Sequence, residues 1–206
     1  MATDGFYSRD NHLIQASYNG TLPVVKDLLK KGADINAEWL SNRLTPLMFA
    51  TESGHLEIVQ ELVRNGADVN IAQKEEGKTA LMIAVNRRHL HIAKFLIESG
   101  ANVNAYIPQD RATPLMMACF VRHLGMVELL IRSGADVNSA TTGNVTPLMI
   151  ACEDGELAIC KTLIKNKAWV NTVRSIDKMT ALDIAIKYGH VDIICELRQC
   201  GAKTKF

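Results

Sequence analysis

The sequence predicts an all-α fold, a solenoid of about six stacked helix–turn–helix units with finger loops. Two observations carry this prediction. The tetrapeptide TPLM stands at 45–48, 113–116 and 146–149, and the close variant TALM stands at 79–82. The threonines that open these motifs, together with Thr180, follow one another at intervals of 34, 34, 33 and 34 residues. A pair of short helices cannot bury its apolar face alone, but stacked pairs can.

The first helix of each unit is predicted to begin at its threonine. Threonine is a good N-cap, because its hydroxyl accepts a hydrogen bond from an otherwise unpaired backbone N–H. Pro46, Pro114 and Pro147 follow at the first helical position, where a missing N–H costs nothing. We expect this helix to run for about eight residues before a glycine ends it. The glycines at this position are Gly20, Gly54, Gly155 and Gly189.

The second helix of each unit is indicated by apolar residues at helical spacing, such as Leu56, Val59 and Leu62. Glycines then close this helix as left-handed C-caps. They are Gly32, Gly66, Gly100 and Gly134. An extended stretch resembling ADVN leads into a polar finger loop and the next threonine.

The phrases TPLM-x-A, GHLEIVQELV and GADVN resemble the ankyrin repeat, whose usual form is TPLH-x-A, GH-x-x-(I/V)-V-x-x-L-L and GADVN. The resemblance covers nearly the whole chain and predicts one domain over 1–206. The predicted units are about 11–44, 45–78, 79–112, 113–145, 146–179 and 180–206. The resemblance implies a curved stack of antiparallel helix pairs. It also implies a non-catalytic scaffold or adaptor, whose concave face and finger loops bind a peptide or a protein.

Three departures from the family pattern carry expectations of their own. Methionine stands where the family has histidine after TPL, which predicts soft apolar filling between units. Asp183 takes this position in the last unit, where we expect it to face water as a cap. Lys167 replaces a C-cap glycine, so either the turn has a different shape there or Trp169 offsets the strain by packing. This stretch is then either a locally irregular turn or a place where Trp169 has a functional role.

No catalytic motif or metal site is indicated. His55, His89, His123 and His190 share one repeat position, so they are expected one repeat apart and cannot ligate one ion. We therefore expect no enzyme and no cofactor. The five cysteines are odd in number and lie in apolar helical patterns, which favours free buried thiols in a reducing compartment. That compartment would be the cytoplasm or nucleus, or a host cytosol for a delivered effector.

The formal net charge of +1 gives no overall attraction to nucleic acid or to an anionic membrane, so any electrostatic preference must come from a local patch. No apolar run approaches the ~18 residues that a membrane-spanning helix needs. We expect no membrane insertion, no nucleic acid partner and a monomer when free.

Residues that vary between units are the candidates for contacting a partner. They lie in the finger loops and at the end of each first helix. The predicted partner-binding residues are Trp39, Leu40, Arg43, Glu52, Arg87, Tyr106, Ile107, Arg111, Phe120, Val121, Glu153, Asp154, Lys187 and Tyr188. Large apolar groups on loops either contact a partner or pack on a neighbouring finger. Phe120 and Val121 are either an anchor for the partner or part of the core.

Arginine replaces the interhelix glycine at Arg88 and Arg122. With Arg87, His89 and His123 they form a possible anion patch, which would hold an acidic segment or phosphate, or would simply be a solvated stripe. The alternative function is therefore a receptor for a small anionic ligand or oligonucleotide. A further alternative is a targeting or regulatory domain of a larger protein, such as a host-directed effector.

Overall fold

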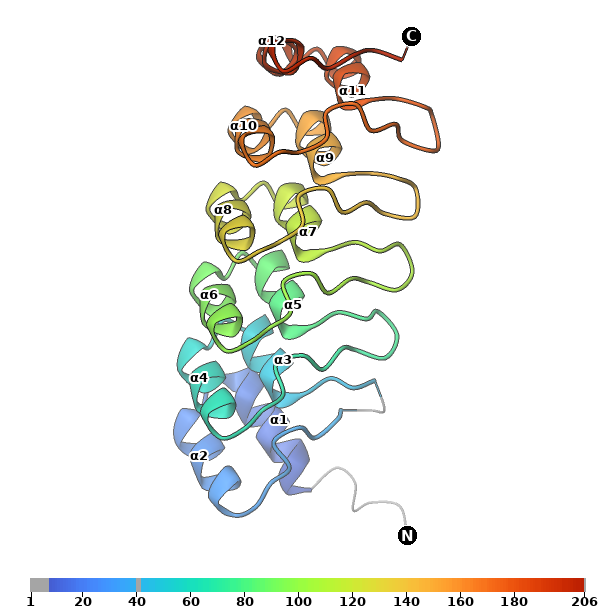
Figure 1. The fold of residues 1–206 in the computed structure, drawn as a ribbon. Coiled ribbons are helices and arrows are strands. Elements are labelled where there is room, and N and C mark those ends of the chain that lie inside the picture. The colour runs from blue at the N-terminus through green and yellow to red at the C-terminus, as the bar shows by residue number, and fades with distance from the viewer. Residues whose placement is uncertain (1–7, 40–41, 206) are drawn as a thin grey trace. The chain divides into compact units, whose positions relative to one another are not determined.

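A computed structural model of the chain describes residues 8–39 and 42–205, and within them every regular element is a helix (Figure 1). The helices are α1 (Arg9–Asn19), α2 (Leu22–Lys30), α3 (Pro46–Glu52), α4 (Leu56–Arg64), α5 (Ala80–Asn86), α6 (Leu90–Glu98), α7 (Pro114–Phe120), α8 (Leu124–Arg132), α9 (Pro147–Glu153), α10 (Leu157–Lys165), α11 (Ala181–Tyr188) and α12 (Val191–Gln199). None of these helices in the described ranges has the length and apolar character needed to cross a bilayer.

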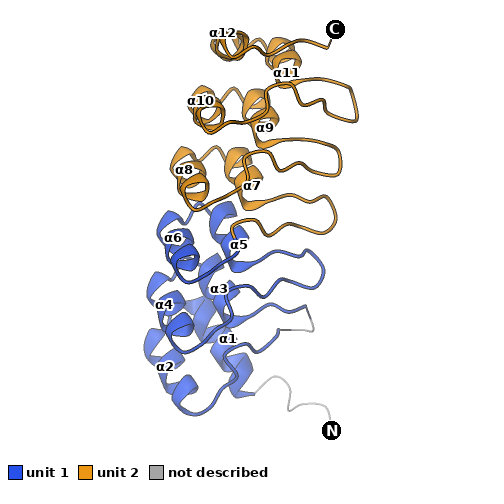
Figure 2. Ribbon diagram, in the orientation of Figure 1, with its two compact units in different colours: residues 1–102 blue, residues 103–206 orange. Residues whose placement is uncertain are grey.

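The chain divides into two compact units, residues 1–102 with α1 to α6 and residues 103–206 with α7 to α12 (Figure 2). In each unit the odd-numbered helices pack on one another and form an inner layer, while the even-numbered helices form an outer layer. The loops that follow the outer helices project to one side as fingers (Figure 1). The predicted all-α solenoid of paired helices is thus confirmed.

The predicted threonine caps are present. Thr45 Oγ1 accepts a hydrogen bond from the Met48 backbone N–H at 3.3 Å. The same bond recurs at Thr79, Thr113, Thr146 and Thr180. Ser8 caps α1 by accepting from the Asn11 N–H at 3.1 Å, so the first helix begins at Arg9, slightly before the predicted start of its unit.

Methionine fills the core at the positions where the pattern predicted soft apolar packing. Met48, Met82, Met116 and Met149 are each 2% exposed or less. They lie among the leucines and alanines of the inner helices, which are similarly buried. Burial of this kind accounts for most of the stability of short helices, because an isolated helix of seven to nine residues is marginal in water.

Asparagines at the end of the ADVN-like stretch tie neighbouring repeats together, a role that the sequence analysis missed. Asn36 Oδ1 accepts the Asp68 N–H at 3.0 Å, and Asn138 Oδ1 accepts the Trp169 N–H at 2.7 Å. Asn70, Asn104 and Asn171 make the equivalent bond. Each bond joins backbone and side chain about one repeat apart in sequence, and so fixes the register of two adjacent turns.

The turn between the two helices of a repeat passes through a left-handed residue. Gly20 adopts φ +80°, and a Cβ there would lie 2.7 Å from a ring carbon of His55. The histidine of one repeat therefore packs on the glycine of the repeat before it. Arg88 and Arg122 hold the same left-handed conformation with φ of 62° and 54°, although a side chain is strained there.

Asp183 corrects one prediction, because it is buried and does not face water. Its exposed fraction is 7%. One carboxylate oxygen accepts the Thr180 N–H at 2.9 Å and the Thr180 hydroxyl at 2.8 Å, and it also accepts the Lys205 N–H at 3.0 Å. Asp183 is therefore a cap in the strict sense, since it closes a capping box and holds the segment that follows α12.

Neither explanation offered for Lys167 survives. Its φ is +69°, so the turn keeps the left-handed shape that glycine adopts in the other repeats. Trp169 is 66% exposed, so it does not offset the strain by packing.

The cysteine prediction is right for only part of the set. All five thiols are free, and Cys119, Cys152 and Cys160 are buried. Cys195 and Cys200 are exposed. They lie on and just after α12, which packs mainly on α11 and α10.

Candidate partner-binding surface

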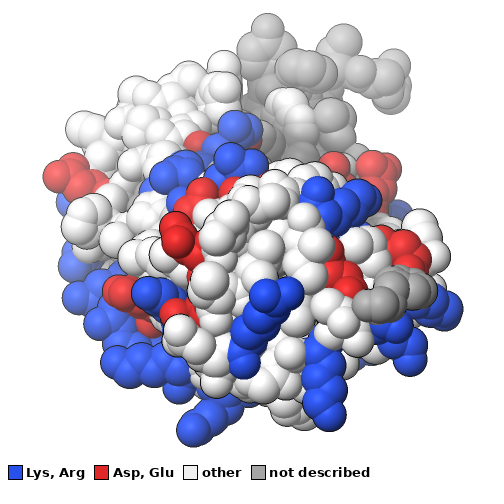
Figure 3. Space-filling view, turned by 90° about the horizontal axis from the view of Figure 1, so that it is seen from above, with Lys and Arg blue, Asp and Glu red and all other residues white. Residues whose placement is uncertain are grey.

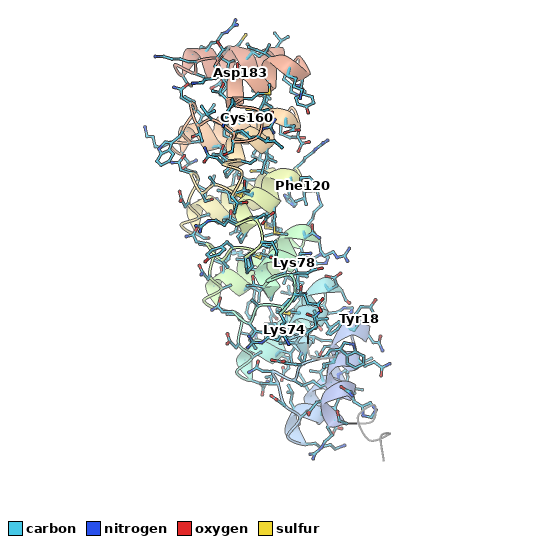
Figure 4. The ribbon with its side chains drawn as sticks, turned by 90° about the vertical axis from the view of Figure 1, so that its right-hand side faces the viewer. Tyr18, Lys74, Lys78, Phe120, Cys160 and Asp183 are labelled. Carbon is cyan, nitrogen blue, oxygen red and sulfur yellow. The ribbon has the colours of Figure 1, made fainter. Side chains whose placement is uncertain are left out.

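The candidate surface combines two structural positions in each repeat. One is the last residue of an inner helix with the capping residue after it, such as Glu52 with Ser53 and Phe120 with Val121. The left-handed residue that follows turns the chain sharply, so the end of the inner helix is left at the surface. The other position is the finger loop. Figure 4 looks onto the fingers and shows Tyr18 and Phe120 at the outer edges of their respective units.

In the first unit an aromatic pair forms the centre of this surface. Tyr18 and Phe49 meet edge to face, with ring centroids 6.1 Å apart and an interplanar angle of 89°. Two cavities, of about 350 and 280 Å³, are both lined by this pair. Tyr18 is 53% exposed. The sequence analysis missed Tyr18, although it occupies the repeat position of Glu52, which was itself singled out.

A charged wall borders the larger cavity. Arg87 Nε donates to Glu52 Oε1 at 2.8 Å, and Lys78 Nζ lies 2.7 Å from Glu76 Oε2. The hydrogen bond with Glu52 raises the pKa of Arg87 above its ordinary value. The two pairs are internally neutralised, so this wall offers hydrogen-bonding groups more than net charge.

The first finger is partly described. Trp39 is half-buried, and its backbone N–H donates to the Leu44 carbonyl at 2.9 Å. Its ring helps to line the smaller cavity beside Tyr18. Arg43 is exposed, left-handed at φ 57°, and paired with Glu38 at 3.2 Å. The predicted site residue Leu40 lies outside the described residues.

In the second unit Phe120, at the end of the inner helix α7, is 71% exposed. Val121 beside it is half-buried. On the finger before α7, Tyr106 is 50% exposed and the Arg111 guanidinium carbon lies 4.9 Å from its ring centroid. Ile107 is half-buried, and its N–H donates to the Ala112 carbonyl at 2.9 Å. An exposed aromatic therefore stands on both structural positions of this repeat.

A polar network joins the next inner helix to a finger. Glu153 accepts hydrogen bonds from Arg174 Nη1 and from the Tyr188 hydroxyl, both at 3.0 Å. Arg174 also donates to Asp177 Oδ1 through Nε at 3.0 Å. The hydrogen bond from Arg174 lowers the pKa of Asp177 to about 2, and the bond to Glu153 raises the pKa of Tyr188.

Arg174 is the member of this network that the sequence analysis missed. Its side chain is only 12% exposed, so it holds Glu153 in place and is not itself a contact for a partner. The finger sequence VRSIDKM did carry a signal, since an arginine three residues before an aspartate can pair with it across a tight turn. The remaining candidates at this end are exposed Lys187, whose ammonium lies 5.4 Å from the Tyr188 ring centroid, and half-buried Asp154.

The residues of the possible anion patch are divided between the two units. In the first unit Arg87 is paired with Glu52, Arg88 is exposed, and the His89 ring packs on Gly54. In the second unit, Arg122 Nη2 donates to Asp154 at 2.6 Å. His123 Nδ1 accepts the Met126 N–H at 3.3 Å and so caps α8. Most of these cations and rings thus have partners within the protein.

No group of three or more His, Cys, Asp or Glu side chains within residues 8–39 and 42–205 is arranged to hold a metal ion. Two of the buried thiols lie together, with the Cys152 and Cys160 sulfurs 3.7 Å apart. Their hydrogen bond and their burial raise the pKa of Cys152, and burial raises that of Cys119. Cys119 and Cys152 are therefore protonated at neutral pH and are poor nucleophiles.

Comparison with known proteins places the repeats in a family. A family model described as ankyrin repeats (3 copies) matches residues 13–107, 47–141 and 115–205, which together span most of the chain. A search of curated proteins finds no significant match. Ankyrin repeats are generally protein–protein interaction modules and are typically non-catalytic. The model match, the capped helix pairs and the repeated turns together show that the chain belongs to the ankyrin-repeat family.

Proposed function

We propose that the protein is a non-catalytic interaction scaffold that binds a peptide or protein partner through its inner-helix ends and finger loops. The observation that supports this most strongly is Phe120, which is 71% exposed at the end of an inner helix. Exposed aromatics of this kind are enriched among the residues that dominate binding energy at protein interfaces. Nothing in the fold of the second unit requires an aromatic side chain there.

The first unit offers a second anchor site of the same kind. Tyr18 and Phe49 line both cavities, and Trp39 lines the smaller of them. A large apolar side chain of the partner fits such a cavity, while the polar wall of Glu52 and Arg87 supplies hydrogen-bonding groups at its rim. Specificity for the partner then arises from the side chains that differ between repeats, because the backbone of the repeats is the same.

The anion receptor has less support than the scaffold. Arg87 and Arg122 each donate to a carboxylate of the protein, and Arg111 lies over an aromatic ring. An incoming anion would have to displace these partners. Binding with strong dependence on salt and on these arginines would reverse this preference.

The experiment compares proteins captured from a cell lysate by the wild-type chain, by Phe120→Ala and by Val191→Ala. Val191 is a matched control, because it is 67% exposed but belongs to an outer helix. We expect Phe120→Ala to lose captured partners that Val191→Ala retains. The free energy of unfolding of both variants should lie within about 0.5 kcal/mol of the wild-type value, since both side chains are exposed. Equal capture by all three chains would contradict a role for Phe120.

A further inference from the structure

The turn that follows α10 departs from the other repeats at two neighbouring positions. Lys167 stands where the other five repeats have a left-handed glycine, and its own φ is +69°. Trp169 stands where the repeats before it have Asp34, Asp68, Asn102 and Asp136. The backbone itself is unchanged, because the Trp169 N–H donates to Asn138 as the equivalent N–H does in the other repeats.

Neither substitution is explained by stability. A lysine in the left-handed region is strained relative to glycine. The Trp169 side chain remains 66% exposed, so the large apolar area that it brings is not buried against the protein. The remaining repeats of the chain show that a smaller polar residue satisfies the same turn.

The departures coincide with a local excess of positive charge. Residues 157–206 contain 9 Lys and Arg against 4 Asp and Glu, whereas residues 1–156 contain 14 against 18. Five cations around the turn are exposed and form no ion pair with any described residue. They are Lys165, Lys167, Arg198, Lys203 and Lys205. A chain with a net charge of +1 thus concentrates positive charge at one end.

Four of these cations lie along one edge of the second unit together with Arg132 and Trp169, and we call this the basic edge. It comprises Arg132, Lys165, Lys167, Trp169, Arg198 and Lys203. Arg132 and Lys165 line one groove of about 320 Å³ between α8 and α10. Lys203 is one repeat beyond Trp169, since its N–H donates to Asn171. Seen from above the last helix pair, Lys and Arg side chains dominate the lower rim of the view (Figure 3).

The basic edge is separate from the inner-helix ends that form one part of the proposed partner-binding surface. The two helices of a pair run in opposite directions, so the C-terminal end of an outer helix lies beside the N-terminal end of its inner helix. The basic edge gathers at the C-terminal ends of α8, α10 and α12, whereas Phe120 stands at the C-terminal end of the inner helix α7. The two surfaces can therefore be tested independently.

We propose that the basic edge binds the surface of an anionic membrane, with Trp169 entering the headgroup region. Clustered lysines and arginines are attracted to acidic lipid headgroups, and an exposed tryptophan favours the boundary between apolar and aqueous layers. Single-stranded nucleic acid fits less well, because its binding sites use several aromatics that stack successive bases along a groove. Trp169 is the only tryptophan, tyrosine or phenylalanine among the edge residues. Three of the five cations of the basic edge are lysines. An ammonium group is a compact point charge that does not require the bidentate geometry of an arginine site.

The test uses the full chain carrying Trp39→Phe, so that Trp169 is the only fluorescent tryptophan. It is mixed with vesicles of phosphatidylcholine alone, or of phosphatidylcholine with about 30% phosphatidylserine, an acidic lipid of the kind that attracts basic clusters. We expect sedimentation with the phosphatidylserine vesicles only, a shift of Trp169 emission to shorter wavelength, and weakening by added NaCl.

Two variants restore the residue types of the other repeats and should therefore fold. Lys167→Gly removes one cation and should weaken vesicle binding about fivefold, and Trp169→Asp should weaken it further because it also adds a negative charge. Tyr106→Ala is the control, since it removes an exposed aromatic from a finger of the same unit and should leave binding unchanged.

The proposal is overturned if Trp169→Asp binds the phosphatidylserine vesicles as well as the parent chain does, or if no shift of emission accompanies sedimentation. It is also overturned if the chain sediments with neither kind of vesicle but binds a single-stranded oligonucleotide in a manner that depends on Trp169. That last outcome would assign the basic edge to nucleic acid. Loss of binding in Tyr106→Ala would likewise place the contact elsewhere.

Discussion

Replacing Lys167 with glycine should stabilise the protein, although a larger side chain is removed. A left-handed conformation costs a non-glycine residue about 1–2 kcal/mol. Glycine relieves this strain but loses about 0.5–1 kcal/mol through its greater freedom in the unfolded chain. The Lys167 side chain is exposed and forms no ion pair with a described residue, so little else is lost. The net gain in the free energy of unfolding is therefore about 0.5–1 kcal/mol.

The assay is urea unfolding followed by circular dichroism, with thermal melting as a second measurement. For a chain of this size a gain of that order raises the melting temperature by about 1–4 °C. Gly134→Lys is the matched reverse change, because Gly134 has φ +89° and open space where a Cβ would be placed. It should lower stability by at least as much as Lys167→Gly raises it. A loss of stability in Lys167→Gly would refute the claim that this turn is strained without compensation.

Three further predictions concern the acid stability of the fold, the packing at a glycine and the reactivity of the cysteines. Asp177 has a pKa of about 2 in the folded protein and about 3.9 in an unfolded chain, so its ionised form stabilises the fold above pH 4. This contribution is lost as the pH falls from 4 to 2. The free energy of unfolding of Asp177→Asn should therefore fall less steeply than that of the wild type over this range. Gly155→Ala should destabilise by about 1–3 kcal/mol in urea unfolding, more than Gly134→Ala, because its Cβ would lie 2.7 Å from a ring carbon of His190. In a titration with a chromogenic disulfide, two thiols should react in the native protein, and the three buried cysteines only after unfolding; rapid reaction of all five would show that the core opens readily.

Local signals made the fold predictable. Each threonine cap, helix-ending glycine and apolar helical stripe acts within a few residues, so the sequence itself displays the interaction. Thr45 and Met48, for example, are three positions apart, and their bond is required by the geometry of any helix start. Repetition gave independent support for the solenoid, because the same helix-start and helix-end signals recur every 33 or 34 residues.

Side chains whose partners lie a repeat away could not be read in the same way. The capping box of Asp183 with Thr180 is a local signal, but the burial of Asp183 also depends on the Lys205 N–H, twenty-two residues further on. Arg174 went unnoticed because it reaches Glu153 across a finger and the end of an inner helix. The spacing of repeats predicts that such residues are near one another, but not which rotamer brings two of them into contact.

The repeats also provide an internal reference against which each departure can be judged. Asp183 departs from methionine, and the structure supplies three hydrogen bonds that account for the change. Trp169 departs as well, and Phe120 stands at a position that varies between repeats, yet both remain more than three-fifths exposed. A departure with partners inside the protein is adequately explained by stability, whereas a departure that adds unburied aromatic surface is not. Phe120 ends an inner helix, whereas Trp169 follows the C-terminal end of an outer helix, and inner and outer helices run in opposite directions. The two side chains therefore favour two separate contacts. A protein partner bound at Phe120 and an anionic membrane bound at Trp169 account for both.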